Sequence, residues 1–325
     1  MKCSRRRFLH LVASAATLPA ISGIARAQPY PARPVRLIVG FPSGGSVDLV
    51  ARLMAQWLTE TLGQPFVVQD QPGAAGNIAT EAIVRANPNG YTLGMVTTAN
   101  SSSLTLYDKL NFNIIRDIVP IASICRVPFV MVVNQSFPAK TVPAFIAYAK
   151  SNPGEINMGS AGNGTPSHIA GELFKEVAGI NMTHVPYSGE PPALVDLIGG
   201  RVQVIFGSLP AFISQIRAGK LRALGVATAS PVEALPGVPT ISEFLHGYEV
   251  AASVGIGSPK NTPAVIIDKL NATINAGLVE PSVKAQLTDL GAPTLALSPA
   301  DYGKLISDEV ENWGKYARDA GIKVE

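Results

Sequence analysis

The sequence predicts an α/β protein made of two α/β domains that are joined by crossing strands. Short apolar strands alternate with amphipathic helices along most of the chain, which is typical of sheets covered by helices. A glycine- and serine-rich turn links a strand to a helix once in each half, at 41–46 and at 159–168. The length of 325 residues is enough for two domains of about 150 residues each.

The first part of the chain has the order β-α-β-α-β. We expect strands at 35–39, 66–68 and 91–96, because each is a short apolar run. Helices are expected at 47–62, where apolar residues recur at helical spacing, and at 78–86, which Asn87-Pro88-Asn89-Gly90 ends. This order predicts a parallel or mixed sheet with helices on its faces.

The alternation continues beyond Pro120. Further strands are expected at 129–133, 156–158, 183–185, 202–206, 223–227 and 250–256. Further helices are expected at 142–150, 167–177, 191–198, 211–218, 263–279, 282–290 and 300–320. Strand crossings near 125–130 and 248–252 predict one domain of residues 28–127 and 251–325 and a second of residues 128–250. The acidic residues of the last helix are interpreted as a solvated face: Asp301, Asp308, Glu309 and Glu311.

The N-terminal 27 residues are interpreted as an export signal. A basic start is followed by an apolar run at 8–24 and by the small-x-small site Ala25-Arg26-Ala27. Ser4-Arg5-Arg6-Arg7-Phe8-Leu9 is similar to the twin-arginine pattern, and an arginine-rich Sec signal is the alternative. We therefore expect an exported protein that begins at Gln28 after cleavage.

Charge and motifs exclude several classes of function. The whole chain has 26 basic and 23 acidic residues, and the signal removes five basic residues and no acidic one, so the mature chain carries a net charge of −2. Without a basic patch, nucleic acid is not expected as a partner. No metal-ligand spacing, cofactor fingerprint or nucleophile motif occurs, so we expect no metal, no cofactor and no enzyme. Cys125 lies in an apolar stretch and is expected to be a buried, inert thiol.

The first glycine-rich turn, Phe41-Pro42-Ser43-Gly44-Gly45-Ser46, predicts a site for an anion. Gly44 and Gly45 permit close backbone approach, and Ser43 or Ser46 is suited to cap the following helix. The free N–H groups and the positive dipole end of that helix would face the ligand. Asp48 in the first helical turn is placed to order the loop. A tight connection without a ligand is the alternative.

The second turn strengthens this interpretation, because two such turns, one per domain, could hold one anion between them. It contains Ser160, Asn163 and Gly164, followed by Thr165 as the expected N-cap and Pro166 as the first helical residue. His168 is expected to be neutral in the first turn, and to pack the helix against the sheet more readily than to contact a ligand. Four further positions are candidate cleft residues: Thr98 and Ser101 at the carboxyl edge of a strand, and Tyr187 and Ser208 on the other wall.

The mature chain resembles the Bug-type periplasmic receptors of tripartite tricarboxylate transporters over residues 29–322. The resemblance rests on motifs in a fixed order: Val35-Arg36-Leu37-Ile38-Val39 with Phe41, Gly44-Gly45 and Asp48; Gln71-Pro72-Gly73-Ala74-Ala75-Gly76; Asn87-Pro88-Asn89-Gly90-Tyr91-Thr92-Leu93; Gly159 through His168; Val185-Pro186-Tyr187; Pro192-Ala193-Leu194; and Leu235-Pro236-Gly237-Val238-Pro239-Thr240.

This resemblance implies a periplasmic-binding-protein fold whose two domains, joined by a strand hinge, close on the ligand. It implies a small carboxylate ligand, held by backbone N–H groups and hydroxyls of the two turns and by ordered water. It also implies delivery to a membrane permease of one large and one small subunit. We expect the receptor to act as a monomer.

The chain departs from the family pattern at four places: Ser43, the stretch 97–103, Ser188 and Ser253. Ser188 and Ser253 either make the cleft more open and less cationic or lie outside it. Two other functions remain as alternatives to transport. One is ligand sensing with a membrane sensor as partner. The other is an exported α/β enzyme acting on carboxylates, against which the absence of catalytic motifs argues.

Overall fold

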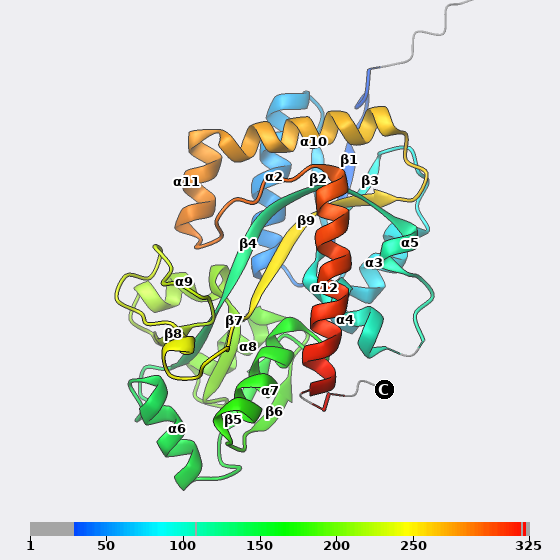
Figure 1. Ribbon diagram of the computed structural model, residues 1–325. Helices are drawn as coiled ribbons and strands as arrows, with labels where there is room; N and C mark the ends of the chain where they lie inside the picture. Colours follow the sequence, from blue (N-terminus) through cyan, green and yellow to red (C-terminus); the bar gives the residue numbers. More distant parts are fainter. Residues whose placement is uncertain (1–28, 108, 320, 323–325) are drawn as a thin grey trace, which may run out of the picture.

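The strands of the computed structural model, which describes residues 29–107, 109–319 and 321–322, lie in the order β2-β1-β3-β9-β4-β7-β5-β6, with β8 paired to β4 (Figure 1). The strands form two sheets that share β4. The expected export signal at 1–27 lies outside the described residues.

The first sheet contains the predicted β-α-β-α-β unit. Strand β1 (Val35–Val39) lies between β2 (Phe66–Asp70) and β3 (Thr92–Thr97), and all three are parallel. Helices α2 (Ser46–Leu62) and α3 (Asn77–Val84) connect them. Of the two expected arrangements, a parallel or a mixed sheet, the structure has the mixed one, because β9 (Ala251–Pro259) joins β3 in antiparallel orientation.

The second sheet is formed by the middle of the chain. Strand β5 (Asn157–Ser160) lies between β6 (Thr183–Pro186) and β7 (Val204–Ser208) in parallel orientation. Strand β8 (Leu221–Val226) and β7 both pair antiparallel with β4. Each expected helix of this part is present within a few residues: α6 (Val142–Ser151), α7 (Pro166–Ala178), α8 (Glu190–Ile198) and α9 (Leu209–Arg217).

Strand β4 (Ile118–Asn134) is much longer than the expected strand at 129–133. Its first part pairs with β9 and its last part with β7 and β8, so this one strand belongs to both sheets. Pro120 and Pro128 make this stretch resemble a loop in the sequence, because proline has no N–H to donate to a neighbouring strand. Register shifts against β9 after Pro120 and after Ser123 accommodate the irregularity.

Two short α-helices of the described chain were not predicted from the sequence. Helix α4 (Thr98–Leu106) has the sequence Thr-Ala-Asn-Ser-Ser-Ser-Leu-Thr-Leu, which is typical of a loop because serine and asparagine favour caps and turns. A capping box between Thr97 and Asn100 begins this helix. The other is α5 (Ile114–Asp117), which Asn113 caps.

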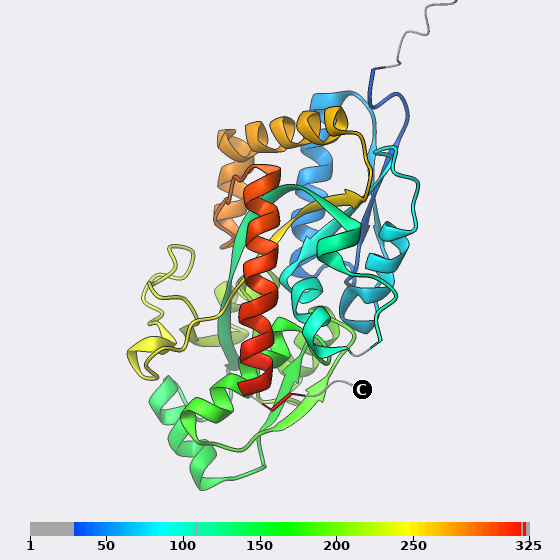
Figure 2. The ribbon, with the colours of Figure 1, turned by 45° about the vertical axis from the view of Figure 1, so that its right-hand side comes forward.

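Three helices end the chain: α10 (Ala264–Val279), α11 (Pro281–Asp289) and α12 (Pro299–Asp319), as expected. Helix α12 runs in front of the crossing strands β4 and β9 and contacts α4 in the first part of the chain and α7 in the second (Figures 1 and 2). The proposed domain boundaries at 127/128 and 250/251 remain a prediction.

The core is built from apolar side chains on both faces of the sheets. One cluster packs α2 and α10 on the first sheet and includes Val39, Met54 and Ile256. Cys125 belongs to it and is fully buried, and this burial raises the pKa of its thiol to about 12, in agreement with an inert thiol.

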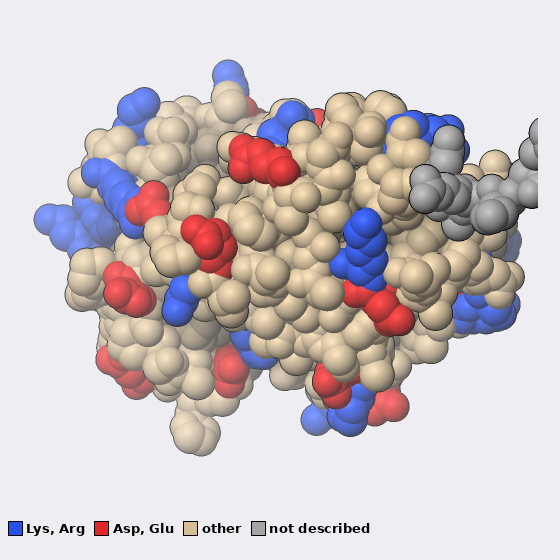
Figure 3. Space-filling model, turned by 90° about the horizontal axis from the view of Figure 1, so that it is seen from above, with Lys and Arg blue, Asp and Glu red and all other residues tan. Residues whose placement is uncertain are grey.

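No helix in the described part of the chain is long and apolar enough to span a bilayer. On the face seen from above, acidic and basic side chains are interspersed, without a broad patch of one sign (Figure 3).

Candidate ligand-binding site

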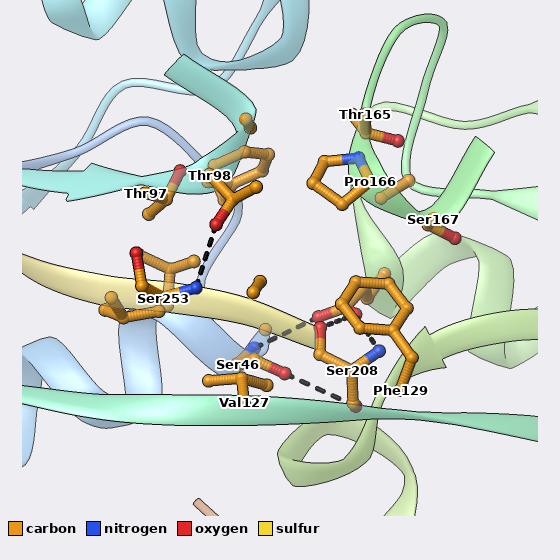
Figure 4. Close-up of a pocket in the computed structure, with 18 of the residues that line it drawn as sticks. Ser46, Thr97, Thr98, Val127, Phe129, Thr165, Pro166, Ser167, Ser208 and Ser253 are labelled. Atoms are coloured by element: carbon orange, nitrogen blue, oxygen red, sulfur yellow. Dashed lines mark hydrogen bonds between the residues drawn. The ribbon is translucent and has the colours of Figure 1, made fainter. Parts of the chain in front are cut away.

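The N-terminal ends of five helices of the described chain border a cleft. The cleft lies between two halves of the molecule, the first sheet with its helices and the second sheet with its helices. Its lining includes Ser46 of α2, Thr98 of α4, Pro166 of α7, Glu190 of α8 and Ser208, which precedes α9. Figure 4 shows Thr98 on one side of the cleft, Thr165 and Pro166 on the other, and Ser46 and Ser208 below them. The empty space between these residues is about 570 Å³, a figure that includes space open to solvent.

The walls of the cleft are mostly apolar, with hydroxyl groups between the apolar side chains. The apolar members are Phe41, Val47, Ala99, Val127, Phe129, Ala161, Pro166, Pro191, Ala252 and Val254. The hydroxyl-bearing members are Ser46, Thr97, Thr98, Thr165, Ser167, Ser208 and Ser253. Glu190 is the single charged side chain among the described residues that line it. Helix N-termini, rather than lysine or arginine, therefore supply the positive potential.

The turn before α2 differs from expectation in its cap. Gly45, with φ −78° and ψ 167°, occupies the N-cap position, and neither Ser43 nor Ser46 caps the helix. The prediction of a serine cap was wrong because both hydroxyls have other partners. Ser43 Oγ donates to Asp48 Oδ2 at 3.2 Å, and Ser46 Oγ donates to the carbonyl oxygen of Ser208 at 3.5 Å.

Asp48 orders this turn, as expected. Its Oδ2 accepts from the N–H of Gly44 at 2.8 Å, and Gly44 has a positive φ of 82° that favours glycine. Burial alone would raise the pKa of Asp48, but hydrogen bonds from Arg52 and from Gly44 outweigh it and lower the pKa. Asp48 thus stays ionised behind the turn and does not line the cleft.

The turn before α7 has the predicted cap. Thr165 Oγ1 accepts from the N–H of His168 at 3.4 Å and donates to the carbonyl of Gly162 at 2.7 Å, and Pro166 is the first helical residue. Gly164 donates its N–H to His168 Nδ1 at 3.2 Å. The hydroxyl of Ser160 lies 2.6 Å from His184 Nε2.

His168 packs on His184, with ring centroids 3.9 Å apart and planes inclined by 13°. Burial lowers the pKa of His168 to about 4, assisted by Lys175 nearby. Burial also lowers the pKa of His184 to about 4, with a contribution from His168. Both rings are therefore neutral at pH 7, and His168, which does not line the cleft, supports the turn from behind.

These two histidines predict a loss of stability in mild acid. An unfolded histidine titrates near pH 6.5, whereas each folded one titrates near 4, so the unfolded chain binds protons first. Their contribution is complete above about pH 6.5 and declines as the pH falls toward 4. Urea unfolding at pH 7 and pH 5 should show a smaller loss for His184→Gln than for the wild type. An equal loss in both proteins would contradict this assignment.

A polar network behind the cleft involves Glu309, which is only 9% exposed. Thr98 Oγ1 donates to Glu309 Oε1 at 3.0 Å and accepts from the N–H of Ser253 at 2.8 Å. Ser101 Oγ donates to Glu309 Oε2 at 3.4 Å. Burial raises the pKa of Glu309, and the hydroxyls of Ser253, Thr98 and Ser101 offset this only in part.

The interpretation of Glu309 as part of a solvated face was wrong. Helix α12 buries Tyr302, Ile306, Trp313 and Ala317, and Glu309 continues this stripe at helical spacing. This spacing was the signal in the sequence that could have identified Glu309 as buried.

The structure distributes the predicted site residues over three environments. Six of them line the cleft: Phe41, Gly45, Ser46, Thr98, Thr165 and Ser208. Asn163 and Tyr187 line an adjoining outer cavity, together with Phe41. The remaining seven line neither space and lie in or behind the turns and α4: Ser43, Gly44, Asp48, Ser101, Ser160, Gly164 and His168. Their contact with a ligand stays a prediction.

Several lining residues were missed from the sequence. The crossing strands β4 and β9 contribute Val127, Phe129 and Ala252 to the floor of the cleft. Nothing in the sequence near these residues indicates that role. Glu190 was missed too, although an acidic residue followed by two prolines marks a helix start. Ser253 lines the cleft and Ser188 lines the outer cavity. Each of these two departures from the family pattern therefore borders one of the two spaces.

Two α/β halves with a cleft between them and with helix N-termini facing it are features of solute-binding proteins of the periplasmic-binding-protein type. The profile described as "Tripartite tricarboxylate transporter family receptor" matches residues 50–322. The chain belongs to this family and is a receptor of the Bug type. Proteins of this family are periplasmic solute-binding proteins, not enzymes.

Relatives and solved structures agree with this assignment. The protein BugT of Bordetella pertussis is 35% identical over 312 residues, which is 94% of this chain and 96% of BugT. The structure of Rpa4515 of R. palustris with adipate has a TM-score of 0.89 and 37% identity, covering 90% of this chain and 99% of that one. MatC of Rhodopseudomonas palustris with bound malate has a TM-score of 0.84 and 31% identity, covering 88% and 99%.

Proposed function

We propose that this protein binds a small carboxylate in the cleft and delivers it to a membrane permease of the tripartite tricarboxylate type. The observation that carries the proposal is the meeting of several helix N-termini at a cleft whose lining contains no lysine or arginine among the described residues. Such ends favour an anion, and they release it more easily than a buried ion pair would. The adipate and malate seen in two similar structures are both carboxylates.

Closure of the two halves would bury the ligand. The lining combines residues from the first sheet and its helices, such as Ser46 and Thr98, with residues from the second, such as Thr165 and Ser208. Strands β4 and β9 run side by side between the halves and contribute Val127 and Ser253 to the cleft. We infer that these strands act as the hinge and that the exported chain, cleaved after Ala27, works as a monomer.

A thermal-shift screen of residues 28–325, unfolded and refolded to remove carried-over ligand, tests the proposal. The panel contains aliphatic mono-, di- and tricarboxylates, aromatic acids, acidic amino acids, sugars and phosphate. A ligand at 100 times its dissociation constant adds about 2.7 kcal/mol of stability, which is readily measured. A shift with a subset of the carboxylates is expected. A shift with a sugar or phosphate alone would reject carboxylate binding.

A further inference from the structure

Glu190 occupies two of the helix N-termini at the cleft with a carboxylate of the protein itself. Its Oε2 accepts from the N–H of Ser46, the first residue of α2, at 3.2 Å. Its Oε1 accepts from the N–H of Ser208 at 2.9 Å and also from the Ser208 hydroxyl, directly before α9. Both oxygens of this partly buried side chain are therefore satisfied by protein donors.

Free donors remain at the N-termini of α4 and α7, which face each other above Ser46 and Ser208 (Figure 4). The first amides of these helices, at Thr98, Ala99 and Ser167, have no carbonyl of their own helix within reach. They are suited to hold one carboxylate. The space between them and Glu190 is walled by apolar side chains, among them Phe129 and Val254.

A second ligand carboxylate at the Ser46 and Ser208 end of the cleft would lie close to Glu190, without a cationic side chain among the described lining residues to offset the repulsion. At a separation of about 6 Å and an effective dielectric constant of about 20, this repulsion reduces affinity about a hundredfold. The hydrogen bonds that a second carboxylate could gain from Ser46 and Ser208 are already taken.

We propose that Glu190 makes this receptor selective for monocarboxylates with an apolar body over dicarboxylates of the same skeleton. This inference rests on the proposed function, because it assigns a selectivity to the same cleft. Glu190 is a specificity-determining residue. Its charge repels a second carboxylate, and its oxygens occupy the hydrogen-bond donors of Ser46 and Ser208.

Calorimetric titration with two matched pairs of acids tests the proposal: hexanoate with adipate, and benzoate with terephthalate. The wild type should bind the monocarboxylate of a pair at least tenfold more tightly. In Glu190→Gln this ratio should fall at least tenfold, because the charge is lost and the NH2 group that replaces one carboxylate oxygen cannot accept a hydrogen bond, so that one of the donors at Ser46 and Ser208 becomes free. Glu176→Gln, an exposed carboxylate farther along α7, is the matched control and should keep the wild-type ratio.

The outcomes separate the two proposals. A wild type that binds the dicarboxylate as tightly as the monocarboxylate overturns the role of Glu190 and leaves carboxylate binding intact. The role of Glu190 is also overturned if the ratio of monocarboxylate to dicarboxylate affinity is unchanged in both Glu190→Gln and Glu190→Ala, with folding verified by circular dichroism and melting temperature. If the wild type binds no acid of the full carboxylate panel, the proposed function fails and this selectivity fails with it.

Discussion

Replacing Ala161 with phenylalanine is expected to reduce carboxylate affinity at least a hundredfold while the fold is retained. Ala161 lies in the turn before α7 and lines both the cleft and the outer cavity, so a phenyl ring there would occupy the space of the ligand. The loss corresponds to about 2.7 kcal/mol of binding free energy. Because Ala161 is only partly buried and borders these two spaces, the added ring fills them and does not enter the packed core.

Calorimetric titration with the best acid of the screen measures this effect, and the melting temperature of the empty protein reports on the fold. Ala147→Phe is the matched control, because Ala147 is exposed on α6 at the far end of the second sheet. Wild-type affinity in Ala161→Phe would mean that the ligand binds outside this cleft.

Replacing Thr98 with valine is expected to destabilise the protein by about 3 kcal/mol or more. The two side chains have nearly the same shape, so the change removes a hydroxyl and little else. Thr98 is fully buried, and its hydroxyl both donates to Glu309 and accepts from the N–H of Ser253. Valine would leave a buried carboxyl group short of one donor and a buried N–H without its acceptor, and each costs about 1–3 kcal/mol.

Urea unfolding at pH 7 gives the free energy for wild type, Thr98→Val and Thr98→Ser. Serine keeps the hydroxyl, so it should recover most of the lost stability despite the missing methyl group. Equal destabilisation by valine and serine would show that the methyl packing matters and the hydrogen bonds do not. The double variant Thr98→Val with Glu309→Gln should be less than additive, because the two residues are in contact.

Periodicity in the sequence predicted most elements of this fold, because strands and helices here have strong local patterns. Helix α2 was expected from its apolar spacing, and the structure begins it one residue earlier, at Ser46. The failures occurred where tertiary contacts override local preference. Helix α4 is rich in serine, but its capping box and its contacts with α12 stabilise it. Strand β4 accommodates Pro120 at a register shift against β9, and Pro128 lies where the pairing with β9 ends and the pairing with β7 begins.

The turns of the candidate site could be predicted from the sequence, whereas the hydrogen-bond partners of its carboxylates could not. Thr165 and Pro166 form a helix start that can be read locally. Glu190 and Glu309 acquire their roles from residues far away in the chain: Ser46 lies 144 positions from Glu190, and Thr98 lies 211 positions from Glu309. A carboxylate on a predicted helix is assigned to solvent unless its partner is known, and only the fold brings the partner close.

The position of β9 has a consequence for biosynthesis. This strand lies between β3 and β4, yet it consists of residues 251–259 of a chain of 325. A ribosome has therefore polymerised more than 250 residues before the gap in the first sheet can be filled. Until then the bordering edges of β3 and of the first part of β4 lack their partner, and unpaired edges invite association with other chains. A nascent or truncated chain that ends before residue 251 should thus depend on chaperones, whereas the complete chain can protect itself.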